Sequence, residues 1–120
     1  MRGNTKQKPI EQKINNSQFE LYKEVIAAIV KAQAEVIGKD LALKKAAKVP
    51  GCVINSNFQV LSISDNPVYV IQSLVNEYYL LSSYSAIRIS QKAIRKIVLD
   101  NPDLPLPQIL LIATEEQFIF

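Results

Sequence analysis

The chain has 120 residues, a length that suits one domain, and carries 14 Lys and Arg against 11 Asp and Glu for a net charge of +3. It contains no His, no Trp and a single Cys. Zinc sites of His and Cys, iron–sulfur clusters and disulfide frameworks need more such residues than one chain offers. Mechanisms with a His general base are excluded as well. We therefore expect no cofactor and no enzyme, unless a site is shared between subunits.

The surplus of positive charge lies at the N-terminus. Residues 1–17 carry four basic residues and one acidic residue, and this local excess equals the net charge of the whole chain. The segment has few large apolar side chains, so burial cannot offset the entropy of ordering it. We predict a disordered basic tail over residues 1–17 and a single, electrically neutral domain over residues 18–120.

No segment has the pattern of a membrane protein or of a secreted one. The longest unbroken apolar run, Val25–Val30, is far shorter than the roughly 20 residues of a membrane-spanning helix. The N-terminus lacks the apolar centre of a secretory signal. We expect a cytoplasmic protein without membrane contact, and a single Cys is compatible with a reducing compartment.

The strongest helical pattern lies between residues 19 and 49. Apolar residues recur there at alternating steps of three and four, although Gln33 and Asp40 occupy two positions of the same register. A continuous helix of this length would extend about 45 Å, more than a compact domain of this size accommodates. Either the helix breaks at Gly38 and Asp40 caps a second helix over 41–48, or it stays continuous and packs against another chain.

A β-hairpin is predicted next. Pro50-Gly51 favours a type II turn, with Gly51 at positive φ. The β-prone runs Cys52–Ile54 and 58–63 flank Asn-Ser-Asn, a sequence suited to a tight loop because Asn tolerates the left-handed conformation. Two strands alone are only marginally stable in water. The hairpin therefore needs a helix behind it, a third strand, or a partner's copy along its edge.

Two further helices are predicted in the second half of the chain. Asn66-Pro67 marks the first start, with Asn as N-cap and Pro at the first helical position. Ser82-Ser83 interrupts this helix, and a second begins near Ser85 and ends at Asn101 because Pro follows.

The C-terminal part is apolar and rich in proline. Residues 102–107 are typical of an extended connector. Ile109–Ile112 and Phe118–Phe120 are too apolar for a solvated tail, and predict either a third strand or a short helix whose first turn holds Pro107. Together the elements specify a predominantly helical α+β domain.

The helix predicted over residues 85–99 carries four cations on one face. They fall within an arc of about 100° at 100° per residue, and no acidic residue occurs from Tyr78 to Leu99. This arc is a candidate surface for anions or nucleic acid, formed by Arg88, Lys92, Arg95 and Lys96. The alternative is a solvated helix face balanced by carboxylates from elsewhere in the fold.

The chain is also predicted to associate with itself. A domain this small has too little interior to bury a helix that is apolar on all sides over Val25–Val30, a hairpin and an apolar C-terminus completely. We therefore expect a homodimer or larger oligomer, formed through the first helix or the C-terminal segment. Candidate interface residues are aromatic or aliphatic: Phe19, Tyr22, Ile26, Ile29, Tyr79, Phe118 and Phe120.

Two functions fit these patterns. The first is a non-enzymatic interaction or regulatory module that acts as an oligomer and binds a protein partner through apolar helical surfaces. The second is nucleic-acid binding through the cationic arc and the N-terminal tail. Cys52 is a candidate redox sensor, although a half-buried strand cysteine is the more common case.

Overall fold

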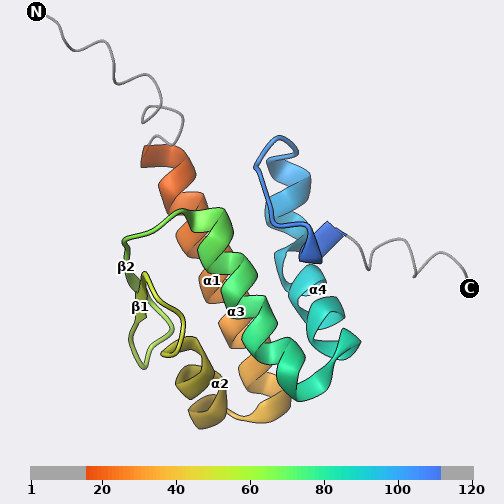
Figure 1. Ribbon diagram of the computed structural model, residues 1–120. Helices are drawn as coiled ribbons and strands as arrows, with labels where there is room; N and C mark the ends of the chain where they lie inside the picture. Colours follow the sequence, from red (N-terminus) through yellow and green to blue (C-terminus); the bar gives the residue numbers. More distant parts are fainter. Residues whose placement is uncertain (1–15, 112–120) are drawn as a thin grey trace, which may run out of the picture.

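The computed structural model describes residues 16–111 of the chain. Its elements are α1 (Asn16–Ile37), α2 (Lys39–Ala46), β1 (Cys52–Ile54), β2 (Val60–Ile63), α3 (Pro67–Ser82) and α4 (Tyr84–Asp100). The four helices pack against one another, and the hairpin covers one side of them (Figure 1). The prediction of a predominantly helical α+β domain is therefore confirmed. The predicted disordered tail lies outside the described residues, except for residues 16 and 17, which belong to α1.

The first helical segment breaks at Gly38, as one of the two alternatives predicted. Gly38 adopts φ +95° and ψ 149°, a conformation that residues with a Cβ rarely take. The break lets α2 turn back and pack against α1. The predicted cap was wrong: α2 starts directly after Gly38, so Asp40 already lies within its first turn. Its carboxylate still suits the positive end of the helix dipole.

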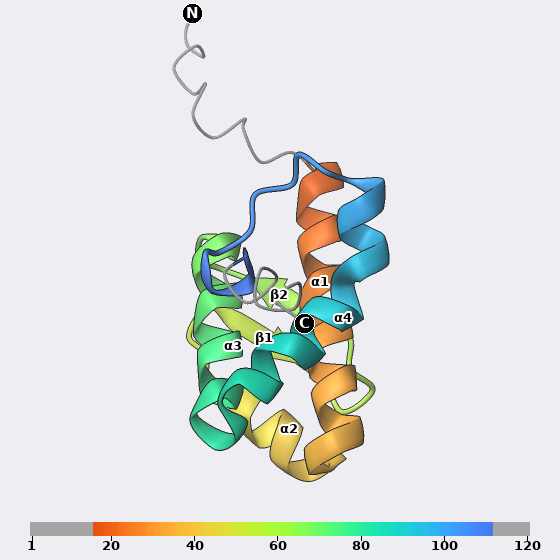
Figure 2. The same ribbon diagram turned by 90° about the vertical axis from the view of Figure 1, so that its right-hand side faces the viewer.

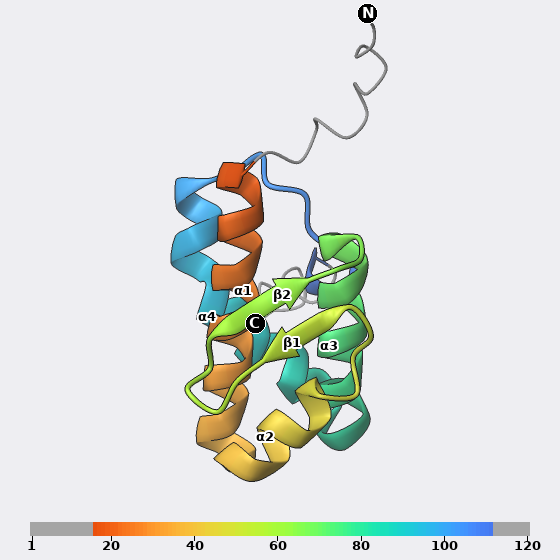
Figure 3. The same ribbon diagram turned by 90° about the vertical axis from the view of Figure 1, so that its left-hand side faces the viewer.

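Helix α1 forms the centre of the core. In Figures 2 and 3, α4 lies along one side of α1, while the hairpin and α2 lie on other sides. Val25, Ile26, Ile29 and Val30 are completely buried. The expectation that a small domain cannot cover this apolar helix was wrong, because α2, α3, α4 and β2 together enclose it. The argument for an oligomer that rested on this helix therefore fails.

The hairpin packs with a helix behind it, the first of the three predicted supports. Helix α1 contacts β2 and α2 contacts β1. Within the loop, the side-chain oxygen of Asn55 accepts hydrogen bonds from the amides of Asn57 (2.8 Å) and Gln59 (3.0 Å). Phe58, at φ +64°, takes the left-handed conformation that we expected of Asn. Consequently the second strand begins at Val60, two residues later than predicted.

Helices α3 and α4 follow the predicted signals closely. The side chain of Asn66 accepts a 2.9 Å hydrogen bond from the amide of Val68, and Pro67 occupies the first helical position. Ser83, at φ +52°, separates the two helices. Helix α4 starts one residue before the predicted Ser85 and ends at Asp100, beside the expected Asn101.

After α4 the chain turns back and descends between α3 and α4 (Figures 1 and 2). Leu104, Pro107 and Leu110 are buried along this path. Residues 109–111 are helical, and the amide of Leu110 donates a 3.0 Å hydrogen bond to the carbonyl of Pro107. Of the two C-terminal alternatives, the described part is therefore the short helix rather than a third strand. The apolar residues 112–120 lie outside the described residues.

Candidate interaction groove beside helix α4

A groove lies between α4 and the returning segment 104–111. Its volume is about 540 Å³. We call it the α4 groove. Among residues 16–111, apolar residues predominate in its lining, and every charged residue of that lining is a cation. The lining residues are Ser85, Arg88, Ile89, Gln91, Lys92, Ile94, Arg95, Val98, Leu99, Leu106, Leu110 and Leu111.

Three of the four predicted cations, Arg88, Lys92 and Arg95, meet in this groove. All three are exposed, and none forms an ion pair with any residue between 16 and 111. Two carboxylates close to α4 in the sequence have other partners: Glu77 lies 3.3 Å from the Lys45 ammonium, and Asp100 pairs with Lys96 on α4 itself. Within the described chain, no carboxylate forms an ion pair with these three cations.

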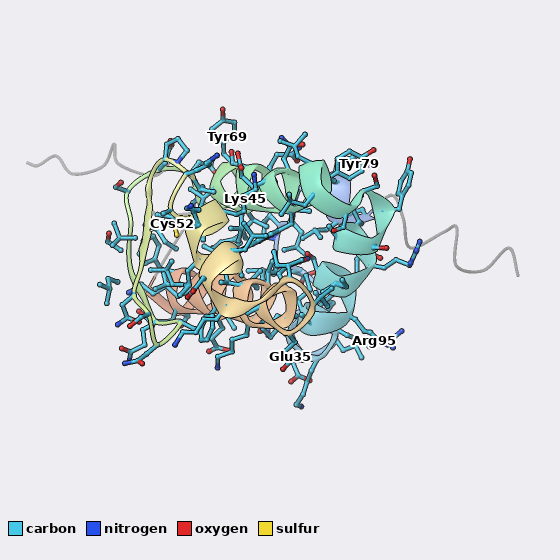
Figure 4. The ribbon with its side chains drawn as sticks, turned by 90° about the horizontal axis from the view of Figure 1, so that it is seen from below. Glu35, Lys45, Cys52, Tyr69, Tyr79 and Arg95 are labelled. Carbon is cyan, nitrogen blue, oxygen red and sulfur yellow. The ribbon has the colours of Figure 1, made fainter. Side chains whose placement is uncertain are left out.

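The fourth cation, Lys96, lies outside the groove lining. Its ammonium is 3.3 Å from the Asp100 carboxylate, one helical turn away, and its side chain is 88% exposed. Such exposed pairs contribute little to stability. The structure thus divides the predicted arc into a groove-lining group of three and one paired surface lysine. Figure 4 shows Arg95 pointing outward from α4, on the side of the molecule opposite Cys52.

The wall of the groove opposite α4 is held in place by two long-range hydrogen bonds. The hydroxyl of Tyr22 donates to the carbonyl of Pro105 at 2.9 Å. The amide nitrogen of Gln91, on α4, donates to the carbonyl of Leu110 at 2.6 Å. The side chain of Leu110 is only 3% exposed, so packing also holds the segment 104–111 in place. Sequence reasoning missed this wall, although its prolines and the Ile109–Ile112 run were the available signals.

The predicted interface residues lie in three different settings. Tyr22, Ile26 and Ile29 are core residues of the single chain, which corrects their assignment to a surface. Phe19 is half-buried. Tyr79 is also half-buried and packs edge-on against the exposed ring of Tyr84, with centroids 5.9 Å apart.

The last two predicted interface residues, Phe118 and Phe120, lie outside the described residues. The large apolar side chains that are exposed belong to other positions. Leu80 (66% exposed), Leu81 and Tyr84 gather at the junction of α3 and α4, and Leu99 (72% exposed) lines the α4 groove. Other exposed apolar side chains are scattered over α1, α2 and the hairpin: Val36, Leu41, Val53 and Leu61.

Cys52 lies half-buried at the start of β1. Burial raises the pKa of its thiol, so the thiolate is less populated at neutral pH than in a free cysteine. Reactive cysteines instead have cations that stabilise the thiolate. The environment of Cys52 is therefore that of a packed strand residue and does not favour redox sensing.

Among helices of the described chain, none combines the length and the apolar character needed to cross a membrane. No protein-family model matches the chain, and neither a curated protein nor a solved structure is significantly similar to it.

Proposed function

We propose that the chain is a non-enzymatic interaction module that binds an acidic, apolar segment of a partner protein in the α4 groove. The observation that carries this proposal is an apolar groove whose three charged lining residues are cations without ion-pair partners among residues 16–111. Apolar lining favours burial of partner side chains. The cations favour carboxylates at the edge of the bound segment and disfavour basic ones.

The dimensions of the groove suit a short amphipathic helix. Its α4 side extends from Ser85 to Leu99, about 21 Å at 1.5 Å per residue. Helices bind such grooves through apolar side chains spaced three or four residues apart. A partner helix of about 14 residues covers this length. Its apolar face would contact Val98, Leu99 and Leu106, and flanking carboxylates would lie near Arg88 and Arg95.

The proposal is tested with the full chain and a labelled helical peptide of about 14 residues, with Leu on one face and Glu on its flanks. Fluorescence anisotropy is expected to give a dissociation constant on the order of 10 µM. A matched peptide with Lys in place of Glu is expected to bind at least about tenfold more weakly. Absence of binding by the acidic peptide contradicts the proposal, and equal binding of both peptides contradicts the role of the cations.

Matched variants assign the binding to the groove. Arg88→Glu with Arg95→Glu should abolish the preference for the acidic peptide, and Leu99→Ser should weaken binding by about tenfold through loss of apolar contact. The controls are Lys96→Glu, on the same helix outside the groove, and Leu61→Ser, which is also exposed but does not line the groove. Both controls are expected to bind the acidic peptide as the wild type does.

A second candidate function is nucleic-acid binding, favoured by the same three cations of α4, which have no ion-pair partner among residues 16–111. Mixed-sequence RNA and DNA would then bind with an affinity that falls steeply as salt rises, because phosphate contacts release counterions. Arg88→Glu with Arg95→Glu would weaken this binding. Leu99→Ser separates the two functions, since it should weaken peptide binding and leave phosphate binding unchanged.

We further propose that the module self-associates, now through the α3–α4 junction rather than through α1. Leu80, Leu81 and Tyr84 supply exposed apolar surface there. Light scattering coupled to size-exclusion chromatography should give the mass of a dimer, and Leu80→Glu should convert it to a monomer. A wild-type monomer at micromolar concentration would contradict self-association.

A further inference from the structure

The last described residue of the chain, Leu111, lies in the lining of the α4 groove. Leu110 and Leu111 line the groove and are the last residues before the segment 112–120. Leu110 is fixed there by burial and by the hydrogen bond from Gln91. Residues 112–120 therefore start at the groove and need no linker to reach it.

The composition of residues 112–120 complements the groove. Glu115 and Glu116 are the only charged side chains of the segment, and both are acidic. Ile112 and the closing Phe118–Phe120 supply bulky apolar side chains. The described lining has three cations and apolar surface, and the sequence of residues 112–120 has two carboxylates and apolar ends. This is the chemistry expected of the partner segment proposed above.

The length of the segment is also sufficient. Nine residues extend up to about 30 Å when fully extended and about 13 Å when helical. The α4 side of the groove is about 21 Å long, so residues 112–120 can reach Arg88, Lys92 and Arg95 from Leu111. Direct attachment gives the segment an effective concentration in the millimolar range at its own groove. The same molecule therefore has an advantage over a second copy.

We propose that residues 112–120 occupy the α4 groove of their own molecule and compete there with the partner segment. This inference rests on the proposed function, because it assumes a groove that takes acidic, apolar segments. When residues 112–120 occupy the groove, a partner binds only the molecules in which the groove is free. The apparent affinity is then the intrinsic affinity multiplied by the fraction of such molecules. Release of the terminus would then switch the module into its binding state.

Zero-length cross-linking of the full chain with a carbodiimide tests the contact directly, because it joins a lysine amine to a carboxylate that touches it. Lys92 is the one lysine in the described lining of the groove. We expect a product between Lys92 and Glu115 or Glu116, located by mass spectrometry and lost in Lys92→Ser. The 3.3 Å pair of Lys96 and Asp100 is an internal control for the chemistry.

An equal mixture of ¹⁴N and ¹⁵N protein shows which molecule supplies the terminus. A product with both parts of one isotope supports occupation by the same molecule, whereas mixed-isotope products at the statistical ratio overturn it in favour of a second copy. Absence of any Lys92 product with Glu115 or Glu116, while Lys96 and Asp100 react, also overturns the inference.

A binding measurement separates this inference from the proposed function. Glu115→Lys with Glu116→Lys in the full chain should increase affinity for the acidic peptide about tenfold. Glu24→Lys with Glu35→Lys makes the same change in charge at exposed positions that do not line the groove, and should raise affinity less. Equal affinities of the two double variants overturn the inference and leave the proposed function intact. If no chain binds the peptide, the proposed function fails, and the cross-link alone decides the inference.

Discussion

The hydroxyl of Tyr22 in α1 donates a 2.9 Å hydrogen bond to the backbone carbonyl of Pro105, 83 residues later in the chain. The bond joins the central helix to the segment that forms one wall of the α4 groove. Burial raises the pKa of Tyr22, so its hydroxyl keeps its proton and remains a donor throughout the neutral range. A residue that the sequence assigned to an interface instead helps to position the candidate binding site.

Tyr22→Phe keeps the ring and removes the hydrogen bond. We expect a loss of about 1 kcal/mol in the free energy of unfolding, measured by urea denaturation. Amide exchange in residues 104–111 should accelerate, because the wall loses an attachment to α1. Tyr69→Phe is the control, since Tyr69 is exposed. Unchanged exchange in residues 104–111 would show that packing alone holds the wall.

The two glycines with positive φ in the described chain should differ in their tolerance of a side chain. At Gly51, with φ +81°, an added Cβ would lie 2.7 Å from the Cβ of Asp65. At Gly38, with φ +95°, an added Cβ would meet nothing within 4 Å. Gly38→Ala should therefore lower the free energy of unfolding by about 1–3 kcal/mol through backbone strain. Gly51→Ala should lower it more, because the close contact with Asp65 adds to the strain. If urea denaturation gave the same loss of unfolding free energy for both variants, the hairpin would have to move aside at residue 51 at little cost.

Tyr78 should make the protein sensitive to alkali. Its hydroxyl is buried and donates a 2.7 Å hydrogen bond to the carbonyl of Ala42. Burial, followed by the nearby charges of Cys52 and Glu77, raises the pKa of Tyr78 far above its ordinary value of about 10. Below pH 10 the folded and unfolded states both keep this proton. Above about pH 10 only the unfolded state releases it, so stability falls as pH rises.

Urea denaturation between pH 8 and pH 11 measures this dependence. Tyr78→Phe should be less stable than the wild type at pH 8, because it lacks the hydrogen bond, but should lose less stability between pH 10 and pH 11. Tyr22 and Cys52 also have raised pKa values and remain in the variant, so a smaller decline is expected to persist. Parallel pH profiles for both proteins would contradict the prediction.

Gln33 forms a buried polar contact between α1 and α4. Its amide nitrogen donates to the carbonyl of Ala86 (3.0 Å) and to the hydroxyl of Ser90 (3.1 Å), while its oxygen has no protein partner among residues 16–111. Removing both side-chain partners together is often nearly neutral. Gln33→Met with Ser90→Ala should therefore change the free energy of unfolding by less than about 1 kcal/mol. A loss above about 2 kcal/mol would show that the network stabilises the pairing of α1 with α4.

Local signals account for much of the fold. Asn66-Pro67 starts α3 through a side-chain cap and a fixed proline φ, and Gly51 takes the positive φ of the turn before β1. These features depend on residues adjacent in sequence, so the sequence predicts them well. The shift of the hairpin loop to Phe58 is different, because the hydrogen bonds of Asn55 selected the loop conformation over the preference of Asn for the left-handed region.

The sequence by itself determined the class of the fold, most element boundaries and the cationic arc of α4. Only the tertiary structure decided between the alternatives for Gly38, because the packing of α2 against α1 depends on contacts distant in sequence. The tertiary structure also buried Val25, Ile26, Ile29 and Val30 within one chain and separated Lys96 from the other three cations of the arc. Helical periodicity gives the direction in which each side chain points around the helix axis. The position of the returning segment 104–111 determines which cations line the groove and which, like Lys96, lie outside it.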